Sequence, residues 1–118
     1  MGVAGERRMG APMDEQTFRA DVEAIYRAVL GRLDREDPDV IEAEMNAGVV
    51  RIRNARGQVY VLNVQPPLRE VWYAAGDRAW HFKQVAARWI DPRNGDELAA
   101  VLGATVSKAA GMAIEFTL

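Results

Sequence analysis

Residues 41–64, IEAEMNAGVVRIRNARGQVYVLNV, decide the fold, because apolar and polar side chains alternate along them with a period of two. Turn residues interrupt this alternation at Ala47-Gly48 and again at Arg56-Gly57. The pattern predicts three short strands, at residues 41–45, 49–53 and 59–64. Turns this short join antiparallel strands, since a parallel pair needs a crossover of about a dozen residues.

The chain on either side of this stretch completes a two-layer domain. Three further short strands are predicted, at residues 68–75, 79–82 and 88–91. Before the strands, apolar residues spaced three and four apart predict an amphipathic helix over residues 14–34. The order helix, about six strands, helix predicts an α+β fold, a two-layer α-β sandwich. Both helices pack on one face of an antiparallel sheet and leave the other face open.

A second helix is predicted near the end of the sequence. Asn94 and Glu97 have the spacing of a capping box at its start, and Gly111 is a suitable residue for its end. Ile114 and Phe116 follow in a short extended tail. We expect this tail to cover the gap between the helices and the sheet.

Length and composition indicate one globular domain. The chain has 118 residues, of which 49% are hydrophobic and 27% charged. Residues 1–12 show no apolar periodicity, and they lack the apolar stretch of a secretory signal peptide. We therefore expect them to be a disordered tail before a domain that spans residues 13–118. The sequence contains no run of about 18 apolar residues, so no membrane span is predicted. The chain lacks cysteine, which excludes disulfides and thiolate metal sites. This is compatible with the reducing cytoplasm, where we expect the protein to reside.

Six acidic residues, from the end of the first helix into the first strand, are the strongest site candidate. Against Arg35 they give residues 34–44 a net charge of −5, which disfavours nucleic acid as the main ligand. Carboxylates are hard ligands that suit divalent cations or iron, although a strand that places Glu42 and Glu44 on the same side does not preorganise them around one ion. We therefore expect weak cation binding at several sites. The alternative is a solvated loop and a charged edge strand that prevents aggregation. We call these residues the acidic ridge: Asp34, Glu36, Asp37, Asp39, Glu42 and Glu44.

Residues for organic catalysis are scarce. His81 is the only histidine and Ser107 the only serine, and they lie far apart in the sequence. A histidine-based zinc site and a Ser-His-Asp arrangement are therefore disfavoured. No glycine-rich phosphate loop is present. We expect a protein that is not an enzyme and carries no organic cofactor.

The open face of the predicted sheet is the second candidate. If Val71 and Tyr73 fill the core, alternation presents Trp72 to solvent, and an exposed tryptophan bordered by amides is typical of a protein interface. The alternative is that neighbouring side chains half-cover Trp72 and that it has no binding role. The candidate partner-binding residues are Asn63, Gln65, Trp72 and His81.

Several motifs resemble those of the frataxin family and its bacterial CyaY type. Residues 63–72, NVQPPLREVW, resemble the signature N-x-Q-x-P-x-x-(Q/E)-(V/I)-W. Residues 44–49, EMNAGV, resemble the turn E-x-N-x-G-V, and residues 80–82, WHF, resemble a strand with an aromatic residue before His-Phe. Residues 89–95, WIDPRNG, resemble the hairpin W-(I/V)-x-x-R-x-G. The resemblance covers about residues 13–118.

This resemblance implies both a fold and a role. It implies the α-β sandwich described above and a non-catalytic role in iron–sulfur cluster assembly. The protein would bind iron (Fe²⁺ or Fe³⁺) weakly at several sites on the acidic ridge. It would dock on the cysteine desulfurase (IscS type) and the scaffold protein (IscU type) to regulate cluster synthesis, and it would be a monomer without iron. The alternatives are iron oxidation and storage of the ferroxidase type, or a generic acidic interaction module.

The end of the first helix departs from the family pattern. Arg32 and Arg35 flank positions where carboxylates are expected, so they neutralise part of the acidic ridge. We therefore expect weaker iron binding than is usual in the family. Docking on a basic partner depends only on the net negative charge and should be less affected.

Overall fold

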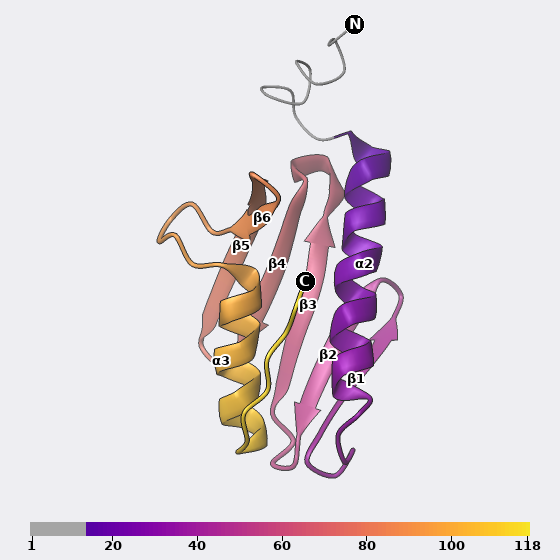
Figure 1. The fold of residues 1–118 in the computed structure, drawn as a ribbon, viewed down its shortest axis with the longest axis vertical. Helices are drawn as coiled ribbons and strands as arrows, with labels where there is room; N and C mark the ends of the chain where they lie inside the picture. Colours follow the sequence, from indigo (N-terminus) through magenta and orange to yellow (C-terminus); the bar gives the residue numbers. More distant parts are fainter. Residues whose placement is uncertain (1–13) are drawn as a thin grey trace, which may run out of the picture.

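Six strands form one antiparallel sheet in the computed structural model, which describes residues 14–118 (Figure 1). The strands lie in chain order across the sheet, β1-β2-β3-β4-β5-β6, and each pairs with its neighbour. The elements are α2 (Glu15–Leu33), β1 (Ile41–Asn46), β2 (Val49–Asn54), β3 (Val59–Gln65), the 3-10 turn η1 (Pro66–Leu68), β4 (Glu70–Ala75), β5 (Arg78–Val85), β6 (Arg88–Ile90) and α3 (Leu98–Ala110). The predicted tail over residues 1–12 lies outside the described residues.

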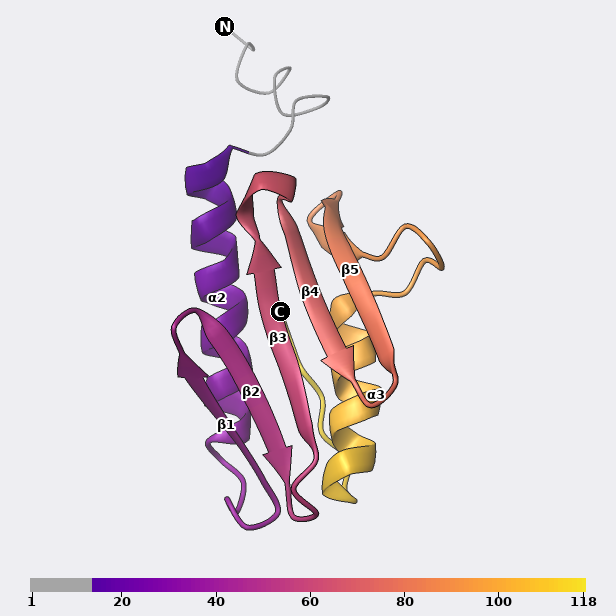
Figure 2. The same cartoon turned by 180° about the vertical axis from the view of Figure 1, so that it is seen from behind.

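Both helices lie on the same face of the sheet, as Figure 1 shows, and Figure 2 shows the opposite face, which no helix of residues 14–118 covers. We call this opposite face the open face. The predicted α+β sandwich is confirmed. The core lies between the helices and the sheet and includes Leu62, Val71, Tyr73, Trp80 and Phe82, none of them more than 2% exposed. Odd-numbered residues of β3 and even-numbered residues of β4 therefore point to the open face.

Helix α2 begins and ends where the sequence predicts. The Asp14 carboxylate caps it by accepting a hydrogen bond from the Thr17 amide at 2.8 Å. Its apolar stripe is buried against the sheet, and the Tyr26 hydroxyl donates to the Gly48 carbonyl at 2.7 Å. This bond ties the β1–β2 turn to the helix. None of the helices in residues 14–118 combines the length and apolarity that a membrane crossing requires.

Strand β1 is less buried than its alternation suggests. Ile41 is buried and Ala43 half-buried, but Met45 on the same side is 53% exposed. Strand β1 is the edge of the sheet, so a side chain near its end has a neighbouring strand on one side only.

The predicted capping box of α3 is wrong. The helix begins at Leu98 with Glu97 as its N-cap, and the Glu97 side chain makes no capping hydrogen bond. Glu97 instead bridges to Ile90 through its backbone and accepts from Arg88 Nε at 3.0 Å. Asn94 accepts from the Asp96 amide within the preceding loop. The loop therefore makes one bridge to β6 before the helix starts. Gly111 ends α3 in the left-handed region, at φ 69°, as predicted.

The C-terminal tail lies between α2 and α3 on the covered face of the sheet (Figure 1). Ile114 is 1% exposed and Phe116 is 8% exposed. The Ser107 hydroxyl accepts from the Ile114 amide at 2.8 Å and donates to its carbonyl at 2.9 Å. Ser107 therefore has a structural role: it fixes the tail against α3, and the predicted cover for the gap is confirmed.

Candidate functional site

The acidic ridge runs from the end of α2 through a loop into β1. Asp34 is the C-cap of α2. The Asp37 carboxylate accepts from the Asp39 amide at 2.9 Å, and the Asp37 carbonyl accepts from the Val40 and Ile41 amides. These bonds fix the loop backbone. All members of the ridge except Glu36 are exposed, so most of its carboxylates face water.

Two arginines pair with carboxylates of the ridge, and one of them, Arg32, is among the two that the sequence analysis named. Arg32 Nη1 lies 2.6 Å from Glu36 Oε2, with both side chains only 18% exposed. Arg53 Nη1 lies 3.9 Å from Glu42 Oε1 across the β1–β2 pair. Among the ridge carboxylates, Glu36 thus has the shortest and most buried ion pair with an arginine.

The remaining ridge carboxylates do not form a cage. Glu42 and Glu44 both point to the open face, where the strand register places them opposite Arg53 and Arg51. Within residues 14–118, no three side chains of His, Asp or Glu gather closely enough to hold one metal ion. The arrangement therefore suits weak attraction of hydrated cations more than tight coordination.

The four predicted partner-binding residues come together on the open face. Asn63, Trp72 and His81 form one row, because Asn63 pairs with Trp72 and Trp72 pairs with His81 across strands β3, β4 and β5. Gln65 lies in the next row, opposite Glu70. The register thus places the two amides on one side of the tryptophan and the histidine on the other.

Trp72 is half-buried rather than freely presented to solvent. The indole of Trp72 and the imidazole of His81 stack with ring centroids 4.0 Å apart and planes inclined by 7°. We call this pair the stacked plate. The neighbouring strand therefore covers part of the ring that alternation alone predicts to be exposed.

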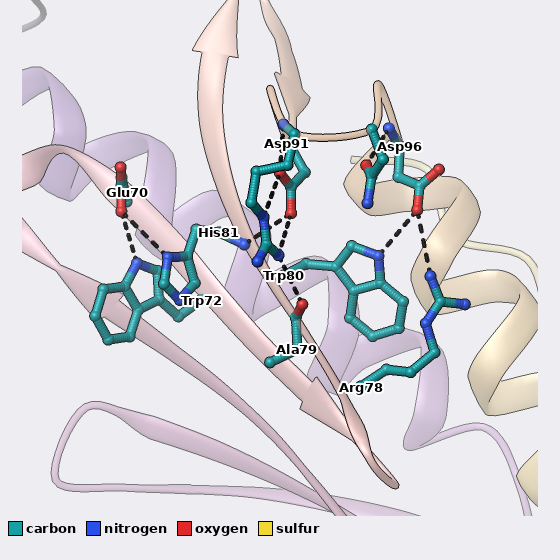
Figure 3. A network of polar contacts seen from close by, with 10 residues as sticks. Glu70, Trp72, Arg78, Ala79, Trp80, His81, Asp91 and Asp96 are labelled. Atoms are coloured by element: carbon teal, nitrogen blue, oxygen red, sulfur yellow. Dashed lines mark hydrogen bonds and ion pairs between the residues drawn. The ribbon is translucent and has the colours of Figure 1, made fainter.

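Glu70 is a member of this surface that the sequence analysis missed. Figure 3 shows its carboxylate beside the nitrogen-bearing edges of the Trp72 and His81 rings, where Oε1 accepts from Trp72 Nε1 at 2.7 Å. Alternation places residues 70 and 72 on the same face of β4, and this pattern alone could have assigned Glu70 to the surface. The burial of Glu70, which is 8% exposed, depends on side chains from β5 and could not be read from β4 alone.

A second polar network, also drawn in Figure 3, supports β5 from the β6–α3 loop. Asp91 is completely buried and accepts from the Arg93 side chain at 2.8 Å, from the Arg93 amide at 2.9 Å and from the His81 amide at 3.2 Å. These bonds, chiefly those of the Arg93 guanidinium, lower the pKa of Asp91 from 3.8 to about 2. Asp96 accepts from Trp80 Nε1 at 3.0 Å in the same loop. The loop thus fixes the backbone beneath the stacked plate.

Fold and sequence agree on the class of protein. An open six-stranded antiparallel sheet with two helices on one face defines a frataxin-like domain, and the family model described as "Frataxin-like domain" matches residues 11–112. The chain belongs to the frataxin family, in its bacterial CyaY type.

Relatives and solved structures support this assignment. The "Iron-sulfur cluster assembly protein CyaY" of Cupriavidus taiwanensis is 36% identical over 109 residues, which cover 89% of this chain and 97% of that protein. The protein of the same name from Tolumonas auensis is 35% identical over 84% of this chain and 94% of its own length. The frataxin of Psychromonas ingrahamii has the same fold, with a TM-score of 0.80 at 24% identity over 90% of this chain and all of that one. A trimeric frataxin of Saccharomyces cerevisiae, complexed with ferrous iron, gives a TM-score of 0.66 at 27% identity, over 84% of this chain and 88% of its own.

Proposed function

We propose that this protein takes part in iron–sulfur cluster assembly, where it binds iron weakly on the acidic ridge and docks on the cysteine desulfurase and scaffold protein. One observation carries the proposal: curated relatives that match this chain over nearly their whole length are named iron–sulfur cluster assembly proteins. The exposed ridge and the open face supply two surfaces on which such a role can rest.

The chemistry of the acidic ridge fits iron as a cargo that is bound and released. Asp and Glu oxygens are hard donors that suit Fe²⁺ and Fe³⁺. The exposed carboxylates of Asp34, Asp37, Asp39, Glu42 and Glu44 would hold the ions, while Glu36 is engaged by Arg32. The yeast frataxin that was solved with ferrous iron is a precedent for iron on this fold.

Neutralising two ridge carboxylates should weaken iron binding without unfolding the domain. Lysine at these positions would face Arg53 and Arg51 across the strands, so Glu42→Gln with Glu44→Gln is the better variant. We expect Fe²⁺ affinity, measured by anaerobic calorimetry, to fall about fivefold, since two exposed charges contribute about 1 kcal/mol in water. The free energy of unfolding should change by less than about 1 kcal/mol.

Glu15→Gln with Glu23→Gln is the matched control. Both residues lie on α2, are exposed and pair with arginines. Each double variant removes two negative charges, so the net charge changes equally in both. This control should leave iron affinity within about twofold of wild type. Equal weakening by both double variants would show that net charge matters and that the ridge has been misassigned.

The open face supports docking, because it presents an aromatic pair bordered by amides and charges. Trp72→Ala should weaken binding to the desulfurase–scaffold complex by about tenfold or more, because buried tryptophans dominate interface energies. It should also cost about 1 to 2 kcal/mol of stability, since it removes the stack on His81. Calorimetry or biolayer interferometry would measure the affinity, and urea unfolding the stability.

Leu68→Ala is the control for Trp72→Ala. Leu68 is a large apolar residue, 56% exposed, in η1 rather than in a strand of the open face. Its removal should leave the affinity within about twofold. Unchanged binding by the Trp72 variant would place the docking surface elsewhere.

We further propose that the protein is not an enzyme. Its ridge carboxylates are spread over a loop and an edge strand, whereas iron oxidation needs several carboxylates held around the metal. Oxygen consumption after addition of Fe²⁺ should therefore equal that of the Glu42→Gln, Glu44→Gln variant. Faster consumption by the wild-type protein would favour the ferroxidase alternative.

A further inference from the structure

The carboxylate of Glu70 is withdrawn from water although no helix of residues 14–118 covers it. Strand β4 places Glu70 on the open face, yet its side chain is only 11% exposed. An ionised carboxylate in such surroundings is unstable unless hydrogen bonds and positive charges replace its water.

Three nitrogen groups surround this carboxylate, and two of them come from the neighbouring strand. Oε1 accepts from Trp72 Nε1 at 2.7 Å and lies 4.0 Å from His81 Nδ1. Oε2 lies 3.5 Å from Lys83 Nζ, and Lys83 is the residue paired with Glu70 in the register. A hydrogen bond to an ionised acceptor is shorter and stronger than a neutral one. The indole edge of Trp72 is therefore firmly held.

This hydrogen bond determines the orientation of the stacked plate. A tryptophan on an uncovered sheet face can rotate among several side-chain conformations, and ordering it on binding costs entropy. Because Glu70 holds the indole edge and approaches the imidazole of His81, it keeps both rings parallel before any partner arrives. The rings, and not the covered carboxylate, remain available for contact.

We propose that Glu70 is a positioning residue, which holds Trp72 and His81 in one preformed binding surface for the assembly machinery. This inference rests on the proposed function, because it assumes that the stacked plate docks on the desulfurase–scaffold complex. Glu70 does not itself touch the partner; it acts through the indole and the imidazole.

Two substitutions of Glu70 keep the length of its side chain and test the hydrogen bond to the indole. Glu70→Met has similar length but no acceptor, while Glu70→Gln keeps an oxygen that accepts from the indole. In ¹⁵N NMR spectra of the free protein, the Trp72 indole N–H is one of three indole signals. In Glu70→Met we expect its hydrogen exchange to accelerate about tenfold and the affinity for the complex to fall about tenfold. In Glu70→Gln, indole exchange and affinity should stay within about threefold of wild type.

Lys83→Met serves as the control, because it removes a charge beside Glu70 without removing the indole bond. It should leave the Trp72 indole signal and its exchange rate unchanged. The proposal is overturned if Glu70→Met leaves indole exchange and affinity at wild-type values, or if Glu70→Gln accelerates indole exchange as much as Glu70→Met. A wild-type protein that fails to bind the complex would refute the proposed function, whereas the indole signals of the free protein would still decide the role of Glu70.

Discussion

Asp91→Ala is expected to destabilise the domain by about 2 to 4 kcal/mol, measured by urea unfolding at pH 7. The Asp91 carboxylate is fully buried and accepts from two backbone amides and the Arg93 guanidinium. Alanine would leave the amides of His81 and Arg93 without their acceptor. Such a loss is a large fraction of the total stability of a small domain.

The same carboxylate makes stability depend on pH. The pKa of Asp91 is about 2 in the folded protein and 3.8 ordinarily, so its ionisation stabilises the fold fully above about pH 4. This stabilisation is lost as the pH falls through 2, and the difference between wild type and Asp91→Ala should shrink over that interval. Asp39→Ala, which removes an exposed carboxylate, should change stability by less than about 0.5 kcal/mol. A constant difference between pH 5 and pH 2 would contradict the assignment.

Removal of residues 113–118 should have the largest effect on stability. It deletes the buried side chains of Ile114 and Phe116 and the two hydrogen bonds to Ser107. Truncating either side chain to alanine alone typically costs about 2 to 5 kcal/mol. Loss of both approaches the whole stability of a domain this small. Circular dichroism should show a truncated protein that is largely unfolded at 37 °C.

A shorter truncation provides the control for this result. Thr117 and Leu118 are exposed, so their removal should change the free energy of unfolding by less than about 0.5 kcal/mol. The single variant Ile114→Ala should lie between the two truncations. A stable, cooperatively unfolding protein that ends at residue 112 would show that the helices close over the sheet without the tail.

The sequence predicts the layers of this fold well because their signals are local. Alternation and short turns define each strand, and strands joined by short turns have few alternative pairings. The burial of Val50, Ile52 and Leu62 follows from that period. Helix α2 is equally predictable, since its cap at Asp14 and its apolar stripe lie within one segment.

Features that depend on partners distant in the sequence were harder to predict. The predicted capping box is wrong because Glu97 bridges to Ile90 at the sheet edge and Asn94 accepts from the Asp96 amide within the loop before α3 begins. The coverage of Trp72 and the burial of Glu70 both require side chains from β5, whose register no single strand reveals. The position of the acidic ridge was predictable, but its pairing with Arg53 required the β1–β2 alignment.

The two networks of Figure 3 meet at His81, whose amide donates to Asp91 on one side while its ring stacks on Trp72 on the other. A genetic screen for poor cluster supply should therefore recover substitutions at both Asp91 and Trp72, although only Trp72 belongs to the docking surface that we propose. Growth temperature would tell the two classes apart. Cells with an altered Asp91 should recover in the cold as the folded fraction rises, whereas cells lacking the indole should remain impaired at every temperature.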